Sequence, residues 1–321
     1  ENLPTSPRSA MDGFSVRAAN TFGASESIPA YLNIVGEVPM GETTKIRLSE
    51  GEAAITYTGG MLAENADSVV MIEHTQAIDN NTIEVSRPIA PGENVIQMGE
   101  DIRSGDIILP AGHLIRPQDI GGLLALGITQ IEVVRQPRVS IVSTGDELVT
   151  PTTTPSLGQI RDINTYVITA LIESSGGIPI RIGMVKDNYE DQRNAAIEGV
   201  SKGDILLFSA GSSLSSRDMT ARVFNSVSEP GVIVHGLSHK PGKPTIVAIL
   251  DGKPAFGLPG NPVSAATVFD LLVRPTIFAM TQSTRQMERL SVHATLTRDI
   301  PSVTGREDHV QIRLVENKGK L

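Results

Sequence analysis

Four short polar loops, each following an apolar run, carry most of the side chains in this sequence that could do chemistry. The loops cover residues 143–147, 186–188, 209–213 and 258–262. If the apolar runs are parallel strands, the loops share one edge of the sheet, where open α/β sheets bind ligands. Each glycine-containing loop taken singly is more typical of an ordinary turn, but the four together predict a ligand-binding site. The candidate ligand-binding residues are Thr144, Gly145, Ser209, Gly211, Ser212, Ser213, Pro259, Gly260, Asn261, Pro262 and Ser264.

The loop 258–262, Leu-Pro-Gly-Asn-Pro, is predicted to be stiff and to begin a helix. Two prolines fix φ on either side of the glycine. Asn261 suits the N-cap of the helix, and Pro262 suits its first turn, where no N–H is needed. We therefore expect free N–H groups at Val263 and Ser264, which could contact an anion. Alternatively, the prolines only keep the loop rigid.

Charged side chains near these loops could bind a cation or an oxyanion. The acidic candidates are Asp12, Asp101, Glu147, Asp187 and Asp218. Mg²⁺ takes oxygen ligands, usually one or two carboxylates together with substrate phosphates. Lys240 and Lys243, in His-Lys-Pro-Gly-Lys-Pro, could hold an oxyanion as point charges. Each of these residues could instead be a solvated surface charge, and Asp218 could instead be a helix N-cap.

Composition limits the partners and the chemistry. The 321 residues are 40% hydrophobic and carry a net charge of −9, so the chain is a poor general nucleic-acid binder. The absence of cysteine excludes disulfides and thiolate metal sites and agrees with a reducing cytosol. No run of about 18 apolar residues occurs, so we expect no transmembrane helix. The sequence starts without Met inside a pattern typical of a loop and stops just after a strand-like run, which suggests a piece of a longer chain.

The pattern of apolar residues predicts several domains. Residues 28–99 contain short β-type runs and predict a small β module. Residues 100–135 predict a helix from Pro117 to Leu126 and then a strand, in a connecting α+β piece. From residue 136 to about 280, apolar strands alternate with helices, which is typical of a doubly wound, mainly parallel sheet.

Several longer motifs together resemble those of molybdopterin molybdenumtransferases of the MoeA/gephyrin type. They are SAMDGF, GGMLAENADSVVMIEHT, GEDIRSGDIILPAGHLI, STGDEL, HKPGKP and GLPGNPVSA, in the family's order and over nearly the whole chain. The expected fold is multi-domain α/β plus β. It has a dimer-forming α+β connecting domain at 1–23 and 100–135, lacking its N-terminal part, and a small β domain at 24–99. An α/β molybdopterin-binding domain at 136–284 and the truncated start of a C-terminal β domain at 285–321 follow.

The resemblance implies a cytoplasmic homodimer with its site shared between subunits. The implied reaction transfers molybdenum from molybdate to adenylylated molybdopterin, releases AMP and uses Mg²⁺; tungstate could replace molybdate. The matching residues imply active-site roles for Asp12, Asp101, Glu147, Asp187, Asp218 and Lys240, substrate contact by Lys243, and metal contact by Asp187 and Asp218. A molybdopterin adenylyltransferase could be a partner, whereas nucleic acid and membrane are not expected.

Two other functions are kept open. One is an enzyme of a related α/β fold that adenylylates molybdopterin, against which the β modules argue. The other is a non-catalytic pterin-binding scaffold, against which the retained carboxylates argue. The sequence departs from the family at residues 210–215, where Ala-Gly-Ser-Ser-Leu-Ser replaces two of the three glycines of GGxSxG.

Overall fold

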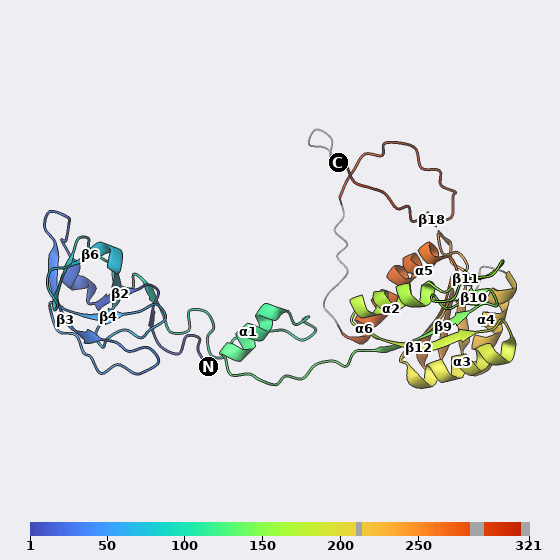
Figure 1. Ribbon diagram of the computed structural model, residues 1–321, viewed down its shortest axis with the longest axis horizontal. Helices are drawn as coiled ribbons and strands as arrows, with labels where there is room; N and C mark the ends of the chain where they lie inside the picture. Colours follow the sequence, from blue (N-terminus) through green and yellow to red (C-terminus); the bar gives the residue numbers. More distant parts are fainter. Residues whose placement is uncertain (210–213, 283–291, 316–321) are drawn as a thin grey trace. The chain divides into compact units, whose positions relative to one another are not determined.

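The structure, a computed structural model, describes residues 1–209, 214–282 and 292–315 (Figure 1). The chain forms two compact units. Unit 1 consists of Glu1–Pro110 and Ile115–Ile131, and unit 2 consists of Ala111–Leu114 and Glu132–Leu321. Gly211, Ser212 and Ser213 of the predicted site lie outside the described residues.

Unit 1 is built on a six-stranded sheet in the order β5-β2-β4-β3-β7-β6. All neighbours are antiparallel except β3 and β4. The strands are β2 Gly13–Val16, β3 Ala30–Glu37, β4 Glu52–Thr56, β5 Ser68–Met71, β6 Thr75–Ala77 and β7 Thr82–Val85. The short strands β1 Arg8–Ser9 and β8 Val95–Ile96 pair beside it, and the 3₁₀ helices are η1 Ala18–Thr21 and η2 Ile72–His74.

This sheet confirms the β-rich character predicted for residues 28–99. Its buried core includes Phe14, Leu32 and Ile83, which come from three different strands. One strand, β2, comes from segment 1–23, which the sequence grouped with residues 100–135. The predicted domain boundaries themselves stay a prediction.

Helix α1, Pro117–Ala125, agrees with the prediction to within one residue. Asp119 Oδ2 accepts hydrogen bonds from the Arg116 backbone N–H at 2.8 Å and from its Nε at 3.0 Å, which fixes the first turn. The strand expected after this helix is wrong, because residues 128–137 form none. Ile131 and Val133 are exposed and pair with no neighbouring strand, and β-propensity without pairing does not make a strand.

Unit 2 contains a six-stranded sheet in the order β12-β9-β13-β17-β16-β14. The first four strands are parallel, and β16 runs antiparallel to both of its neighbours. The mainly parallel sheet is therefore confirmed. The strands are β9 Arg138–Thr144, β12 Ile178–Val185, β13 Ile205–Ser209, β14 Gly231–His235, β16 Ile246–Leu250 and β17 Lys253–Leu258. Two short pairs join β10 Leu148–Val149 with β11 Ile160–Arg161, and β15 His239–Lys240 with β18 Glu307–Asp308.

Helices cover both faces of this sheet (Figure 1). The helices are α2 Asn164–Ser174, α3 Tyr189–Lys202, α4 Leu214–Val227, α5 Pro262–Val268, the π-helical turn η3 Phe269–Val273 and α6 Arg274–Met280. Val139 and Ile141 of β9 pack with α2 and α5, whereas Val142 packs with α3 and α4. Because side chains alternate along a strand, Ser143 faces the α2 side and Thr144 faces the α3 side.

The continuous helical segment Pro262–Met280 is long and apolar enough, by length and composition alone, to cross a membrane. Ala265, Val268, Phe269 and Ile277, however, are buried in the same core as the strands of unit 2. The spacing of these residues places them on one face of the helix. Burial of this face is a property of a core helix of unit 2.

Candidate functional site

The carboxyl ends of β9, β12, β13 and β17 lie on one edge of the unit 2 sheet, called here the carboxyl edge. Val185 is opposite Thr144, and Ser209 is opposite both Ser143 and Leu258. The parallel pairing thus confirms that the loops after these strands start from a common edge. This is the edge at which open α/β sheets bind ligands.

An acidic group occupies the α3 side of the carboxyl edge. The Asp187 N–H donates to Asp146 Oδ1 at 3.3 Å. Burial raises the pKa of Asp187, and the negative charges of Asp146 and Glu147 raise it further. Gln192 Nε2 donates to Asp187 Oδ1 at 3.2 Å and opposes that pKa shift. Gly145 lies beside this group, since a Cβ there would be 2.7 Å from Glu147 Oε2.

Asp218 lies inside α4, because that helix begins at Leu214. The alternative N-cap role for Asp218 is therefore wrong. Four residues later, the Arg222 guanidinium lies 5.5 Å from the ring of Tyr189, at the start of α3. Residues four apart share a helix face, so Asp218 faces the region where α3 follows Asp187. The described residues contain no group of three His, Cys, Asp or Glu side chains that could hold a metal ion.

A neutral polar group occupies the α2 side. Asn164 Nδ2 donates to Ser209 Oγ at 2.9 Å and to the Gly260 carbonyl at 2.8 Å. The residue is held at the start of α2 because Asp162 accepts the Thr165 N–H at 3.1 Å and its hydroxyl at 2.6 Å. Sequence reasoning missed Asn164, since a polar residue at the start of a helix signals the helix end and no more.

Several buried polar atoms at the carboxyl edge have no hydrogen-bond partner within the described part of the chain. They include Ser143 Oγ, Asn164 Oδ1 and Gln192 Oε1. Leaving such an atom unpaired costs about 1–3 kcal/mol, so native proteins rarely tolerate several together. Their concentration at one edge points to a ligand that supplies the missing partners.

The loop 258–262 does not offer the free N–H groups that the sequence suggested. Asn261 Oδ1 accepts from the Val263 N–H at 3.1 Å and from the Ser264 N–H at 3.3 Å. The expectation of unpaired donors there is wrong, because the N-cap side chain takes the same two N–H groups that an anion would need. Pro259 is buried, and the Gly260 carbonyl accepts a hydrogen bond from Asn164, so the loop forms a rigid wall of the carboxyl edge.

The basic loop 239–244 presents Lys240 and Lys243 as exposed side chains. Gly242, between the two lysines in sequence, packs so closely on α5 that a Cβ there would lie 2.5 Å from Val268 Cγ2. The His239 ring nitrogen Nδ1 lies 2.7 Å from the Pro241 carbonyl oxygen. The loop is therefore anchored by its glycine and histidine while its lysines remain accessible.

The C-terminal segment holds the same loop from its other side. The Glu307 N–H donates to the Ser238 carbonyl at 2.9 Å, and the His309 N–H donates to the Lys240 carbonyl at 2.7 Å. Ser302 and Arg306 lower the pKa of Asp308, with a smaller contribution from the charge of Lys240. The anionic Asp308 thus adds to the backbone pairing of β15 with β18.

Two predicted acidic residues, Asp12 and Asp101, belong to unit 1, whereas the others belong to unit 2. Asp12 Oδ1 accepts from the Thr58 N–H at 2.7 Å and from its hydroxyl at 2.8 Å. These bonds lower the pKa of Asp12, so it is a carboxylate at neutral pH. Asp101 is exposed, and its N–H donates to the Leu3 carbonyl at 3.1 Å.

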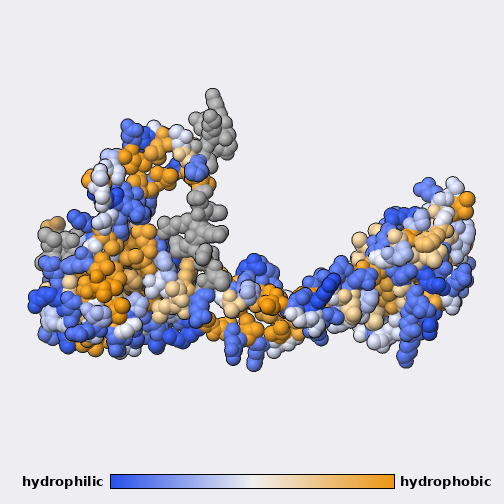
Figure 2. All heavy atoms as spheres, turned by 180° about the vertical axis from the view of Figure 1, so that it is seen from behind, coloured by the Kyte–Doolittle hydropathy of each residue, from blue (hydrophilic) through white to orange (hydrophobic). Residues whose placement is uncertain are grey.

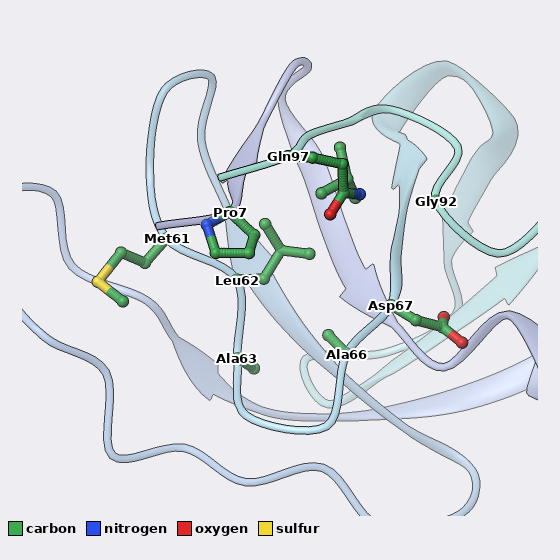
Figure 3. A pocket seen from close by; sticks show the side chains of 9 residues that line it. Pro7, Met61, Leu62, Ala63, Ala66, Asp67, Gly92 and Gln97 are labelled. Carbon is green, nitrogen blue, oxygen red and sulfur yellow. The ribbon is translucent and has the colours of Figure 1, made fainter. Parts of the chain in front are cut away.

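Unit 1 also has a pocket of about 420 Å³ (Figure 3). Its lining is Pro7, Met61, Leu62, Ala63, Ala66, Asp67, Gly92, Val95 and Gln97. Asp67 Oδ1 accepts from the Ala18 N–H at 2.7 Å and from Ser68 Oγ at 2.9 Å, which ties this carboxylate to the fold. None of the site residues predicted from the sequence lines this pocket.

Two family descriptions match the chain. The first, "MoeA N-terminal region (domain I and II)", matches residues 1–127. The second, "Probable molybdopterin binding domain", matches residues 140–279. This second range covers the loops of the carboxyl edge and the basic loop.

Named relatives and solved structures agree with these matches. A molybdopterin molybdenumtransferase of Nostoc sp. is 33% identical over 279 residues, which cover 86% of this chain and 64% of that protein. A crystal structure of a MoeA protein of molybdopterin biosynthesis from Pyrococcus horikoshii has 38% identity and a TM-score of 0.74, covering 88% of this chain and 70% of that one. A second, from Pyrococcus horikoshii OT3, has 31% identity and a TM-score of 0.79, covering 96% and 75%.

Proposed function

This chain belongs to the MoeA family of molybdopterin molybdenumtransferases, and we propose that it transfers molybdenum from molybdate to adenylylated molybdopterin with release of AMP. As a member of that family it is a transferase of molybdenum cofactor biosynthesis. The molybdenum ends on the dithiolene sulfurs of the pterin, so a chain without cysteine is suited to the reaction.

The observation that carries this proposal is the division of polar groups at the carboxyl edge. Asp146, Glu147 and Asp187 lie on the α3 side. Ser143, Asn164 and Ser209, which are neutral, lie on the α2 side. An adenylylated pterin needs both kinds of surface, because its heterocycle requires neutral hydrogen-bond partners and its phosphates require a cation.

Asp187 is the residue best suited to hold Mg²⁺ together with the substrate. A divalent cation would relieve the repulsion by Asp146 and Glu147 that contributes to the raised pKa of Asp187. Mg²⁺ usually takes one or two carboxylates and completes its shell with water and substrate phosphates, so a three-ligand protein group is not required. Asp218, on the face of α4 toward α3, is the second candidate ligand. The bound ion would neutralise and polarise the phosphoanhydride.

Lys240 and Lys243 are proposed to hold the oxyanion. Both are exposed on a loop that α5 and β18 anchor. Lysines act on an oxyanion as point charges and do not demand one fixed geometry. The same arrangement would accept molybdate or tungstate, and competition between the two in the assay below measures the preference.

We also propose a cytoplasmic homodimer in which Asp12 and Asp101 of one subunit serve the carboxyl edge of the other. Helix α1 buries Leu123 but exposes Ile120 and Leu124. Figure 2 shows the apolar surface that results around this part of the chain. Contiguous exposed apolar residues are typical of contact surfaces. A molybdopterin adenylyltransferase is the proposed supplier of the adenylate.

The test is an assay of the purified protein with adenylylated molybdopterin, Mg²⁺ and molybdate. AMP and molybdenum cofactor should form, formation of the cofactor should require molybdate, and Asp187→Asn should slow AMP release at least about 100-fold. No AMP release by the unmodified protein would exclude the proposal. ATP-dependent formation of the adenylate would instead indicate an adenylyltransferase, and binding without turnover would indicate a scaffold.

A further inference from the structure

A single side chain, Asn164, joins two loops of the carboxyl edge. Its amide nitrogen lies 2.9 Å from Ser209 Oγ and 2.8 Å from the Gly260 carbonyl oxygen. Ser209 is the last residue of β13, and Gly260 follows β17. These two strands are neighbours in the sheet, so the amide connects their ends on the α2 side.

The Gly260 carbonyl determines the orientation of the amide. A carbonyl oxygen only accepts hydrogen bonds, so the atom facing it must be Nδ2 of Asn164. Both N–H donors of the amide are then used, one on each loop. The oxygen Oδ1 is buried and has no partner within residues 1–209, 214–282 and 292–315. Only an additional hydrogen-bond donor can satisfy it.

Ser143 places a second unpaired atom on the same side of the sheet. Its Oγ is buried without a partner among the described residues, and its side chain faces α2, the helix that begins at Asn164. The two atoms carry no charge, unlike the acidic group on the α3 side. The α2 side is therefore suited to a neutral, hydrogen-bonding part of a ligand rather than to phosphate or metal.

We propose that Asn164 is a positioning residue of the substrate site. It fixes the spacing between the ends of β13 and β17 and presents Oδ1 to an N–H or O–H donor of the substrate. This inference rests on the proposed function for the identity of the substrate, whose pterin ring carries N–H donors. Its effect on the spacing of the two loops does not depend on that identity.

The first experiment measures amide hydrogen exchange in the full chain without ligand. Asn164→Ala should speed exchange about tenfold in peptides covering 205–209 and 255–261, the change expected for loss of one or two hydrogen bonds. Thr169→Val is the matched control. It removes another buried hydroxyl of α2, which donates to the Thr165 carbonyl at 2.7 Å one turn further along the helix, and should leave these two peptides unchanged.

The second experiment separates binding from chemistry. With adenylylated molybdopterin, Asn164→Ala should raise KM about tenfold and change kcat less than about twofold, because the lost contacts exist before the reaction. Asp187→Asn should show the opposite pattern. Asn164→Asp keeps the shape of the side chain but sets an oxygen against the Gly260 carbonyl. Its KM should match that of Asn164→Ala at pH 8. Burial against the carbonyl should raise the pKa of the new carboxyl, so KM should fall toward the parent value as the pH is lowered and the protonated carboxyl regains one donor.

Unchanged exchange in both peptides together with an unchanged KM would overturn the proposal. If the parent protein has no activity with this substrate, the proposed function fails, while the exchange experiment still decides the role of Asn164. If Asn164→Ala does not fold, the pH series on Asn164→Asp takes its place, measured as exchange in the same peptides. Amide exchange also depends on pH for chemical reasons, which the Thr169→Val variant measures. If Asn164→Asp shows only that dependence, the proposal is contradicted.

Discussion

Asp204 holds the chain at the point where it enters the sheet of unit 2. Arg135 donates to both carboxylate oxygens, at 2.8 and 3.0 Å, and the Arg138 N–H donates to Oδ2 at 2.7 Å. The Arg135 guanidinium contributes most to lowering the pKa of Asp204 to about 2, against partial burial, which raises it. A bidentate pair of this kind fixes direction as well as distance, so it orients the segment before β9.

The pKa of Asp204 predicts how the stability of unit 2 depends on pH. The folded pKa is below the ordinary value of 3.8, so the stabilising contribution of Asp204 is complete at neutral pH and is lost as the pH falls from about 4 to about 2. Asp204→Asn should cost about 1 kcal/mol at pH 7, after allowance for solvent screening, and only about a third of that at pH 2.5. Urea unfolding at both pH values measures this. Glu198→Gln, which removes an exposed pair with Lys202, should change stability by less than about 0.5 kcal/mol at either pH.

The exposed lysines of the basic loop should act on the oxyanion and not on the fold. Replacing Lys240 and Lys243 together by Ala should raise the molybdate concentration required for half-maximal activity at least about tenfold. The urea midpoint should hardly change, since both side chains are exposed. Lys202→Ala, at the far end of α3, is the control. An unchanged molybdate requirement in the double variant would exclude this role for the lysines.

Sequence reasoning correctly predicted that the loops at 143–147, 186–188, 209–213 and 258–262 start from one edge of a sheet. It did not predict which hydrogen bonds their residues make. Asn261 was expected to cap a helix, and it does so by taking the N–H groups of Val263 and Ser264. Asn164 carried no signal, because its importance arises from Ser209 and Gly260, 45 and 96 residues away. Contacts over such distances follow from the order of strands, which local patterns do not specify.

At the scale of elements, the pattern of apolar residues predicted strands and helices correctly where burial determines the structure. The strand β13, Ile205–Ser209, is fully buried and its sequence is apolar except for its last residue. Helix α3 is preceded by a capping residue, Asn188. Residues 128–137 contain β-branched residues but have no partner strand, so their propensity was misleading. Asp218 is a common cap by residue type, but α4 already begins at Leu214, so the alternative cap role was wrong.

The contact between the basic loop and α5 gives a prediction at this scale. Gly242 has φ +107°, and a Cβ there would lie 2.5 Å from Val268 Cγ2 and 2.7 Å from His239 Cε1. Gly242→Ala should therefore destabilise unit 2 by about 2–3 kcal/mol and raise the molybdate requirement. Gly252→Ala is the matched control, because Gly252 has φ +72° but open space around its Cβ position. It should cost only about 1 kcal/mol in urea unfolding and leave the molybdate requirement unchanged. Equal effects of the two variants on stability and activity would contradict the close contact.

At the scale of the whole molecule, the chain contains separate cores. Phe14, Leu32 and Ile83 belong to a cluster within unit 1, whereas Ile141, Leu207 and Phe269 belong to a cluster within unit 2. Each cluster is enclosed by elements of its own unit. A unit with its own buried core and sheet can fold without the other. The acidic candidates of unit 1 therefore do not depend on unit 2 for their local structure, although the proposed reaction requires both.

This independence predicts the behaviour of the isolated unit 2. A protein comprising residues 132–321 should unfold cooperatively in urea, with the midpoint of one of the transitions of the full chain, because its two core clusters are intact. A protein comprising residues 189–321 is the control. It lacks β9, the second strand of the six-stranded sheet, and should not unfold cooperatively. Circular dichroism during the titration measures both. Absence of a cooperative transition in residues 132–321 would mean that unit 1 supplies part of the stability of the sheet.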